Sequence, residues 1–216
     1  MTEKINAILG IDDIFKAPDR LLDILLDKPL REKIFLQFFE LFDHKLENDF
    51  FHSYFQAEAA QRKKMSQDFT PMSVASLVSQ LVESKTGDGM YFEPSVGTGG
   101  MMIAKWHSDR IKENPIFYKP SQYMYVGEEL SDRAFPFLVF NMAIRGMNGA
   151  AVHCDSLTRE CYGVFFMQND DDNPSGFSSI NIMPYTSDAE NFFKVSFVNK
   201  KYLHHVESQN LFARLT

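Results

Sequence analysis

The chain has 216 residues, a length that allows one substantial domain with an appendage but is short for two full domains. Its net charge of −7 counts against a protein that coats nucleic acid unaided, and its 44% hydrophobic and 24% charged residues are ordinary for a globular chain. Cys154 and Cys161 match neither a metal-ligand nor a disulfide spacing, so we expect both to be reduced and expect no metal. No signal peptide opens the chain, and no apolar run approaches the roughly 18 residues of a membrane span. We therefore expect no membrane segment and a cytoplasmic location.

Residues 1–64 are predicted to form a small helical module. From Pro29 onward, apolar residues recur at spacings of three and four with charges between them, as in amphipathic helices. Asn48 and Asp49 are candidates to cap a second helix entered at Phe50. The apolar face of this module either packs against the following domain or contacts a partner, and the pattern leaves both alternatives open.

Residues 65–216 are predicted to form one α/β domain, because helical and strand patterns alternate along them. The pattern predicts, in chain order, a helix from Thr70, a turn at 86–89, a strand at 90–92, a helix through 101–106, a loop at 114–121, a strand at 123–126, a helix at 130–145, and strands at 150–153 and 164–167. The runs 180–183 and 194–198 are weaker strand candidates. Such alternation is typical of a mostly parallel sheet with helices on both faces.

Three acidic residues, Glu93, Glu129 and Asp155, fall at the carboxyl ends of three successive predicted strands. Ligands of open α/β sheets bind at these ends of the strands. The spacing therefore predicts a ligand site that contains the three carboxylates.

A glycine-rich loop, Pro94-Ser95-Val96-Gly97-Thr98-Gly99-Gly100, joins the first of these strands to its helix. Glycines permit positive φ and let backbone N–H groups approach an anionic ligand. The loop is not a phosphate-binding P-loop, because Met101 follows it in place of lysine, and Met102 occupies the position of the third glycine of a dinucleotide fingerprint.

Four segments then follow in a recognisable order: Ser66-Gln67-Asp68-Phe69-Thr70-Pro71, Tyr91 to Gly100, Val126 to Leu130, and Cys154-Asp155-Ser156-Leu157. Over residues 66–157 the chain resembles the N6-adenine DNA methyltransferases related to the modification subunit of type I restriction-modification systems. The corresponding stretches of that family read approximately QYFTP, DPACGSGG, GQE and GDTL. The segment Asn141 to Gly146 also resembles its MNLxxxG stretch.

The resemblance implies a Rossmann-like, S-adenosylmethionine-dependent methyltransferase fold. Glu129 would accept hydrogen bonds from the ribose hydroxyls, and Asp155 would receive the exocyclic amine of the cofactor's adenine; helix capping is the alternative role for Glu93 and Asp155. The lip over the methionine part would be Phe69, Thr70 and Pro71. The amino and carboxylate groups of the cofactor would be held by Glu93 and by the loop residues Pro94, Ser95, Gly97, Thr98, Gly99 and Gly100.

The catalytic motif of the family is altered in this chain. A motif like NPPF follows the fourth strand in that family; its Asn side chain and a proline carbonyl accept hydrogen bonds from the extruded adenine amine, and its aromatic ring stacks on the base. Here Asn169 has the right position without the prolines. Asn173, Pro174 and Phe177 form a partial motif four residues later. Between them, the aspartates 170–172 would either repel DNA phosphates or form a solvated turn.

Two hypotheses follow from these patterns. In the first, the protein methylates the N6 amine of adenine in DNA, and a separate specificity subunit or the basic segment 191–216 supplies recognition, since the chain ends soon after the motif. In the second, it is a catalytically inactive methyltransferase-like protein that acts through protein contacts, such as modulation of a restriction-modification system.

Overall fold

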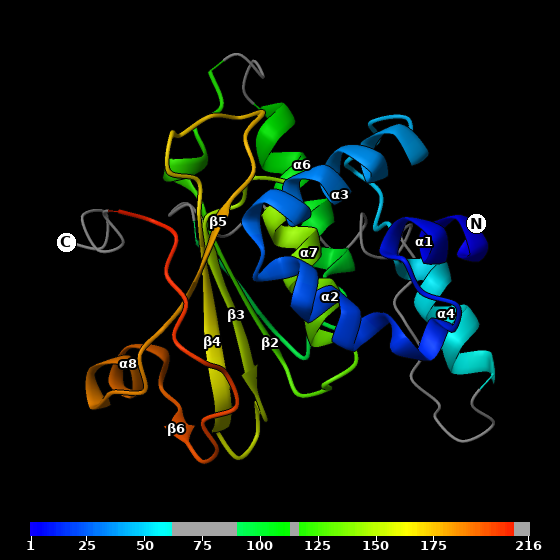
Figure 1. Ribbon diagram of the computed structural model, residues 1–216. Coiled ribbons are helices and arrows are strands. Elements are labelled where there is room, and N and C mark those ends of the chain that lie inside the picture. The colour runs from blue at the N-terminus through cyan, green and yellow to red at the C-terminus, as the bar shows by residue number, and fades with distance from the viewer. Residues whose placement is uncertain (62–89, 113–116, 210–216) are drawn as a thin grey trace.

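The computed structural model describes residues 1–61, 90–112 and 117–209, and the elements below are those of these ranges (Figure 1). The predicted helix from Thr70 and the turn at 86–89 lie outside the described residues. None of the described helices is long and apolar enough to cross a membrane.

The N-terminal module contains the helices α1 (Thr2–Leu9), α2 (Ala17–Leu25), α3 (Lys28–Leu41) and α4 (His52–Gln61), with a 3₁₀ turn η1 at Ile14–Lys16. Asp27 caps α3 by accepting a hydrogen bond from the N–H of Leu30 at 3.1 Å, and Pro29 occupies its first turn. Asp49 likewise accepts from the N–H of Phe51 at 3.0 Å, directly before α4.

The apolar face of the module packs against the α/β domain. Figure 1 shows α2 and α3 lying beside α7 (Phe135–Ile144), every residue of which is buried. Phe35 and Phe38 of α3 contact the ring of Phe140 in α7, with ring centroids 4.7 and 4.8 Å apart. One hydrophobic core therefore runs from the module through α7 to the sheet.

The sheet follows the order β1 (Met90–Pro94), β2 (Met124–Glu129), β3 (Gly149–Cys154), β4 (Glu160–Gln168) and β5 (Ser179–Ile182), and the short β6 (Ser196–Phe197) pairs with β4. β1, β2 and β3 are parallel, and β6 is parallel to β4. The predicted mostly parallel sheet is thus confirmed, and both weaker strand candidates form strands. The pairings of β4 with β3 and β5 are antiparallel.

The direction of β4 follows from a short connection. Only residues 155–159 separate β3 from β4. A parallel crossover needs roughly a dozen residues or more, whereas a hairpin needs only a few. β4 therefore turns back along β3 in place of continuing the parallel series.

Helices cover the two faces of the sheet unequally. The crossover helices α6 (Gly100–Lys112) and α7 both pack on one face, because the strand order follows the chain order. The second face packs against Phe193 of the short helix α8 (Ser187–Phe193) and against Val195 just after it, in a smaller cluster with Val126, Val152 and Phe166. α7 begins later than predicted, because Ser131 holds residues 131–134 in a turn, and it ends as predicted before Gly146, whose φ is 63°.

Candidate cofactor site

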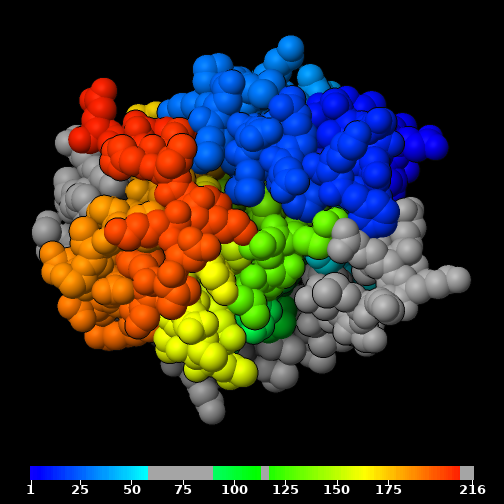
Figure 2. Space-filling view, turned by 60° about the horizontal axis from the view of Figure 1, so that its bottom comes forward, coloured from blue at the N-terminus to red at the C-terminus, as the bar shows by residue number. Residues whose placement is uncertain are grey.

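The three predicted acids lie where the parallel strands end, which we call the carboxyl edge of the sheet. Glu93 and Glu129 sit at the carboxyl ends of β1 and β2, and Asp155 directly follows β3. The register places Pro94 opposite Glu128, and Glu129 opposite His153. Figure 2 brings this end of the sheet forward, with the yellow turn between β3 and β4 beside green segments of the chain.

The glycine loop is seated on the end of β2. Gly97 and Gly99 have φ of 61° and 98°, the left-handed region that glycine adopts without strain. The N–H of Val96 donates to the carbonyl of Glu128 at 2.9 Å. A Cβ on Gly127 would lie 3.0 Å from the Cγ1 of Val96 in the loop and 2.7 Å from the Cε of Met102 in α6, so the missing side chain of Gly127 lets the loop and the helix approach the strand.

Glu129 supports the loop from the sheet side. One carboxylate oxygen accepts from the N–H of Gly97 and the other from the N–H of Ser131, both at 2.8 Å. The residue is only 8% exposed. Each carboxylate oxygen has two acceptor positions, so one on each oxygen is left for a further donor.

Glu93 is half-buried beside the start of α6. The hydroxyl of Tyr91 donates to its carboxylate at 2.9 Å, and a backbone hydrogen bond from Met102 also reaches it. Burial raises the pKa of Glu93 to about 7, which these two hydrogen bonds oppose. Within the described ranges, no basic side chain forms an ion pair with Glu93, so a cationic ligand would stabilise its charged form.

Asp155 closes the turn between β3 and β4. Its Oδ1 accepts from the N–H of Leu157 at 2.8 Å and of Thr158 at 3.2 Å, and these bonds hold its pKa below the usual value. β4 follows β3 directly, so Asp155 caps this turn and not a helix.

The remaining cofactor candidates divide into two groups. Phe69, Thr70 and Pro71 lie outside the described residues. The others belong to the glycine loop, which runs from Pro94 at the end of β1 to Gly100 at the start of α6. Within it, Ser95 has a φ of 54° and Thr98 is buried.

The catalytic candidates lie at the opposite edge of the sheet from the three acids. Met167 at the end of β4 pairs with Gly149 at the start of β3. Asn169 and the partial motif with Asn173, Pro174 and Phe177 therefore follow β4 at the amino ends of the parallel strands. At about 3.3 Å per residue, a strand of this length separates the two edges by roughly 17 Å, so the structure does not bring the two sets together.

Asn169 uses its side-chain amide within its own loop. Its Nδ2 donates to the carbonyls of Gly146 at 3.2 Å and Asn173 at 2.8 Å, and its Oδ1 accepts from the N–H of Asn173 at 2.9 Å. Phe177 packs against Phe35 and Phe39 of α3. Asn169 thus holds the loop together and to Gly146, and Phe177 packs the loop onto α3.

Two of the aspartates at 170–172 accept hydrogen bonds from serines. Asp172 accepts from the N–H and the hydroxyl of Ser121 at 2.7 and 2.8 Å, and Asp170 accepts from the hydroxyl of Ser179 at 2.6 Å. The loop and the start of α3 enclose a small polar cavity of about 180 Å³ that includes Lys28. This segment is thus an ordered turn with specific partners.

Sequence reasoning missed a second support of the glycine loop. The hydroxyl of Thr98 donates to Asp49 at 2.6 Å, and the side-chain amide of Asn141 donates to Asp49 at 2.9 Å and to the carbonyl of Thr98 at 2.8 Å. Arg145 in turn donates to the side chain of Asn141 at 2.9 Å. The Asn141–Gly146 stretch was a signal for part of this network, whereas Asp49 had only the sequence pattern of a helix cap.

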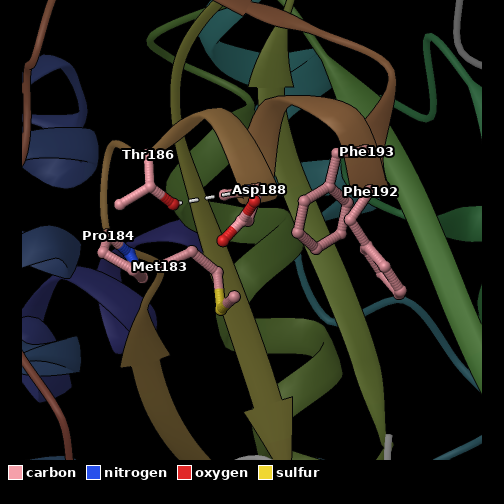
Figure 3. A pocket seen from close by; sticks show the side chains of 7 residues that line it. Met183, Pro184, Thr186, Asp188, Phe192 and Phe193 are labelled. Atoms are coloured by element: carbon pink, nitrogen blue, oxygen red, sulfur yellow. Dashed lines mark hydrogen bonds between the residues drawn. The ribbon is translucent and has the colours of Figure 1, made fainter.

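A larger apolar pocket of about 440 Å³ lies beside α8, on the second face of the sheet (Figure 3). Met183, Phe192 and Phe193 line it, together with the polar residues Thr186 and Asp188. None of the predicted site residues lines this pocket.

The mostly parallel sheet, with a glycine loop and acids at the carboxyl ends of its strands, has a Rossmann-like fold, in which ligands bind at these ends. A family model described as N-6 DNA methylase matches residues 48–173, more than half of the chain. The chain therefore belongs to the N-6 DNA methylase family, whose members are S-adenosylmethionine-dependent methyltransferases. The family supports a DNA N6-adenine methyltransferase-like function for this chain. No curated protein matches it.

Proposed function

We propose that this protein binds S-adenosylmethionine at the glycine loop and does not by itself transfer the methyl group to adenine. The observation that carries the proposal is the antiparallel direction of β4. It separates the candidate acceptor residues from the loop by the length of the sheet.

The residues at the carboxyl edge fit the cofactor, which when bound supplies an electrophilic methyl group. Its ammonium suits the carboxylate of Glu93, which is half-buried and has no cationic partner in the described ranges. The free acceptor positions of Glu129 suit the ribose hydroxyls. The N-terminus of α6 offers backbone N–H groups to the cofactor's carboxylate.

The described part of the carboxyl edge lacks the motif that would receive adenine. Transfer requires the base amine within contact distance of the methyl group and in line with it. Asn169 engages its amide in its own loop, and Phe177 packs on α3. Reorienting both would break the hydrogen bonds of Asn169 and the packing of Phe177 on α3.

The first experiment is isothermal titration of the protein with S-adenosylmethionine. We expect micromolar binding, about −8 kcal/mol. Glu93→Gln should weaken it by about 1–1.5 kcal/mol, the difference between a hydrogen bond to a charged group and a neutral one. The matched control is Glu40→Gln on α3, where the carboxylate is 82% exposed, and it should leave binding unchanged.

Two results would contradict the proposal. Absence of binding at millimolar cofactor would remove its first half. Transfer of a labelled methyl group to adenine in mixed-sequence DNA by the purified chain would remove its second half.

The second candidate is an active DNA adenine methyltransferase that works with a separate specificity subunit. The observation in its favour is that the family match continues to residue 173, past Asn169. The labelled-methyl assay separates the two candidates. If the protein is inactive, protein contacts are its remaining mode of action, such as modulation of a restriction-modification system.

A further inference from the structure

Asp49 is a buried carboxylate that the N-terminal module contributes to the back of the glycine loop. It is 8% exposed and lies between α3 and α4. Its Oδ2 accepts from the hydroxyl of Thr98 at 2.6 Å. Its Oδ1 accepts from the side-chain amide of Asn141 at 2.9 Å and from the N–H of Phe51 at 3.0 Å.

A buried cation completes this network. Arg145 is 3% exposed and donates to the carbonyls of Leu46 and Asn48, on the segment that leads to Asp49. Burial lowers the pKa of Arg145 to about 9, and the negative charge of Asp49 opposes this shift. The carboxylate thus has three donors and a nearby opposite charge, the conditions under which a buried charge is tolerated.

The loop is therefore held from two sides. Glu129 binds the N–H of Gly97 from the sheet, and Asp49 binds the side chain of the next residue, Thr98, from the module. α7 fills the space between, since a Cβ on Gly99 would lie 3.2 Å from the Cδ1 of Leu138. Removal of either support leaves a loop with positive φ values fixed at one side only.

We infer that Asp49 is a positioning residue of the cofactor site, which fixes the conformation of residues 95–99 through Thr98 and Asn141. The inference rests on the proposed function, because the loop is the part of that site that approaches the cofactor. It also gives the N-terminal module a function beyond packing: the module completes the site from behind.

The test compares two substitutions of one residue. Thr98→Val removes the hydroxyl and keeps the shape of the side chain, whereas Thr98→Ser keeps the hydroxyl. Thr186→Val is the control, because the Thr186 hydroxyl also makes a structural hydrogen bond, in which it accepts from the N–H of Ala189 at 3.3 Å, but lies beside α8. Each full-length variant is titrated with S-adenosylmethionine, and hydrogen exchange is measured at the amides of Gly97 and Gly99.

Thr98→Val should weaken cofactor binding about tenfold or more, since the lost hydrogen bond is to a charged group. Thr98→Ser keeps the donor to Asp49 and should weaken binding much less than Thr98→Val does, whereas Thr186→Val should bind as the unmodified protein does. In Thr98→Val alone, the amides of Gly97 and Gly99 should exchange faster. Unchanged binding in Thr98→Val, with the unmodified protein binding, would overturn the inference.

Hydrogen exchange keeps this test separate from that of the proposed function. If the unmodified protein does not bind the cofactor, the proposed function fails, and exchange alone decides the positioning role. Faster exchange at Gly97 and Gly99 in Thr98→Val than in Thr98→Ser supports that role, and equal exchange refutes it. The double variant Asp49→Asn with Thr98→Val should lose little more binding free energy than the single variant that binds the cofactor more weakly, because both changes affect the same contact.

Discussion

The ion pair of Glu128 and Arg159 allows an asymmetric prediction. Both oxygens of Glu128 accept from the guanidinium at 2.7 Å, a bidentate geometry. The side chain of Glu128 is 2% exposed and that of Arg159 is 33% exposed. Removing Arg159 therefore leaves a carboxylate without its partner in the interior, whereas removing the Glu128 charge leaves a guanidinium that water can reach.

We expect Arg159→Met to cost about 3 kcal/mol of unfolding free energy, the lower end of the cost of breaking a buried pair. The midpoint of thermal unfolding would fall by roughly 6–12 °C for a chain of this size. Glu128→Gln should cost about 1 kcal/mol, because the guanidinium stays partly solvated and keeps hydrogen bonds to the carbonyls of Lys194 and Phe193.

Urea unfolding of the two single variants and the double variant measures these free energies. The double variant should be more stable than Arg159→Met, because it no longer contains a buried charge without a partner. Equal costs for the two single variants, or a double variant at the sum of both, would refute the reasoning from burial.

The remaining predictions concern Glu93 and two glycines. The folded-state pKa of Glu93, about 7, lies above its ordinary value of 4.5, so its contribution to stability is full below about pH 4.5 and is lost as pH rises through 7. In urea unfolding, the free energy of unfolding of Glu93→Gln should therefore rise relative to that of the unmodified protein between these two pH values and not at higher pH. A difference that is constant with pH would contradict this. Gly149→Ala should cost at least about 3 kcal/mol of unfolding free energy, because its Cβ would lie 1.8 Å from the carbonyl oxygen of Tyr125. Gly10→Ala has open space around it and should cost only about 1 kcal/mol, because of the φ of 71°. Similar midpoints of thermal unfolding for the two variants would refute this.

The parallel strands were predictable because their signals are local. Apolar runs with a proline or glycine nearby mark β1, β2 and β3. The predicted runs 90–92 and 150–153 fall within the observed strands, and the run 123–126 begins one residue before β2. The hairpin of β3 and β4 was also within reach of the sequence, because a connection of residues 155–159 is too short for a crossover. The apolar pattern alone did not reveal it, since the pattern of a strand is the same in both directions.

The sequence by itself determined that Glu93, Glu129 and Asp155 end three strands and that a glycine loop follows the first. The tertiary structure alone decided their partners: Glu129 binds the loop, Asp155 closes its own turn, and Glu93 is half-buried without a cationic partner in the described ranges. It also brought Asp49 to the loop from a helical module that precedes it in the chain. The physical reason is that periodicity and spacing report burial and local conformation, whereas a hydrogen-bond partner or a shifted pKa depends on groups that only the folding of distant segments brings together.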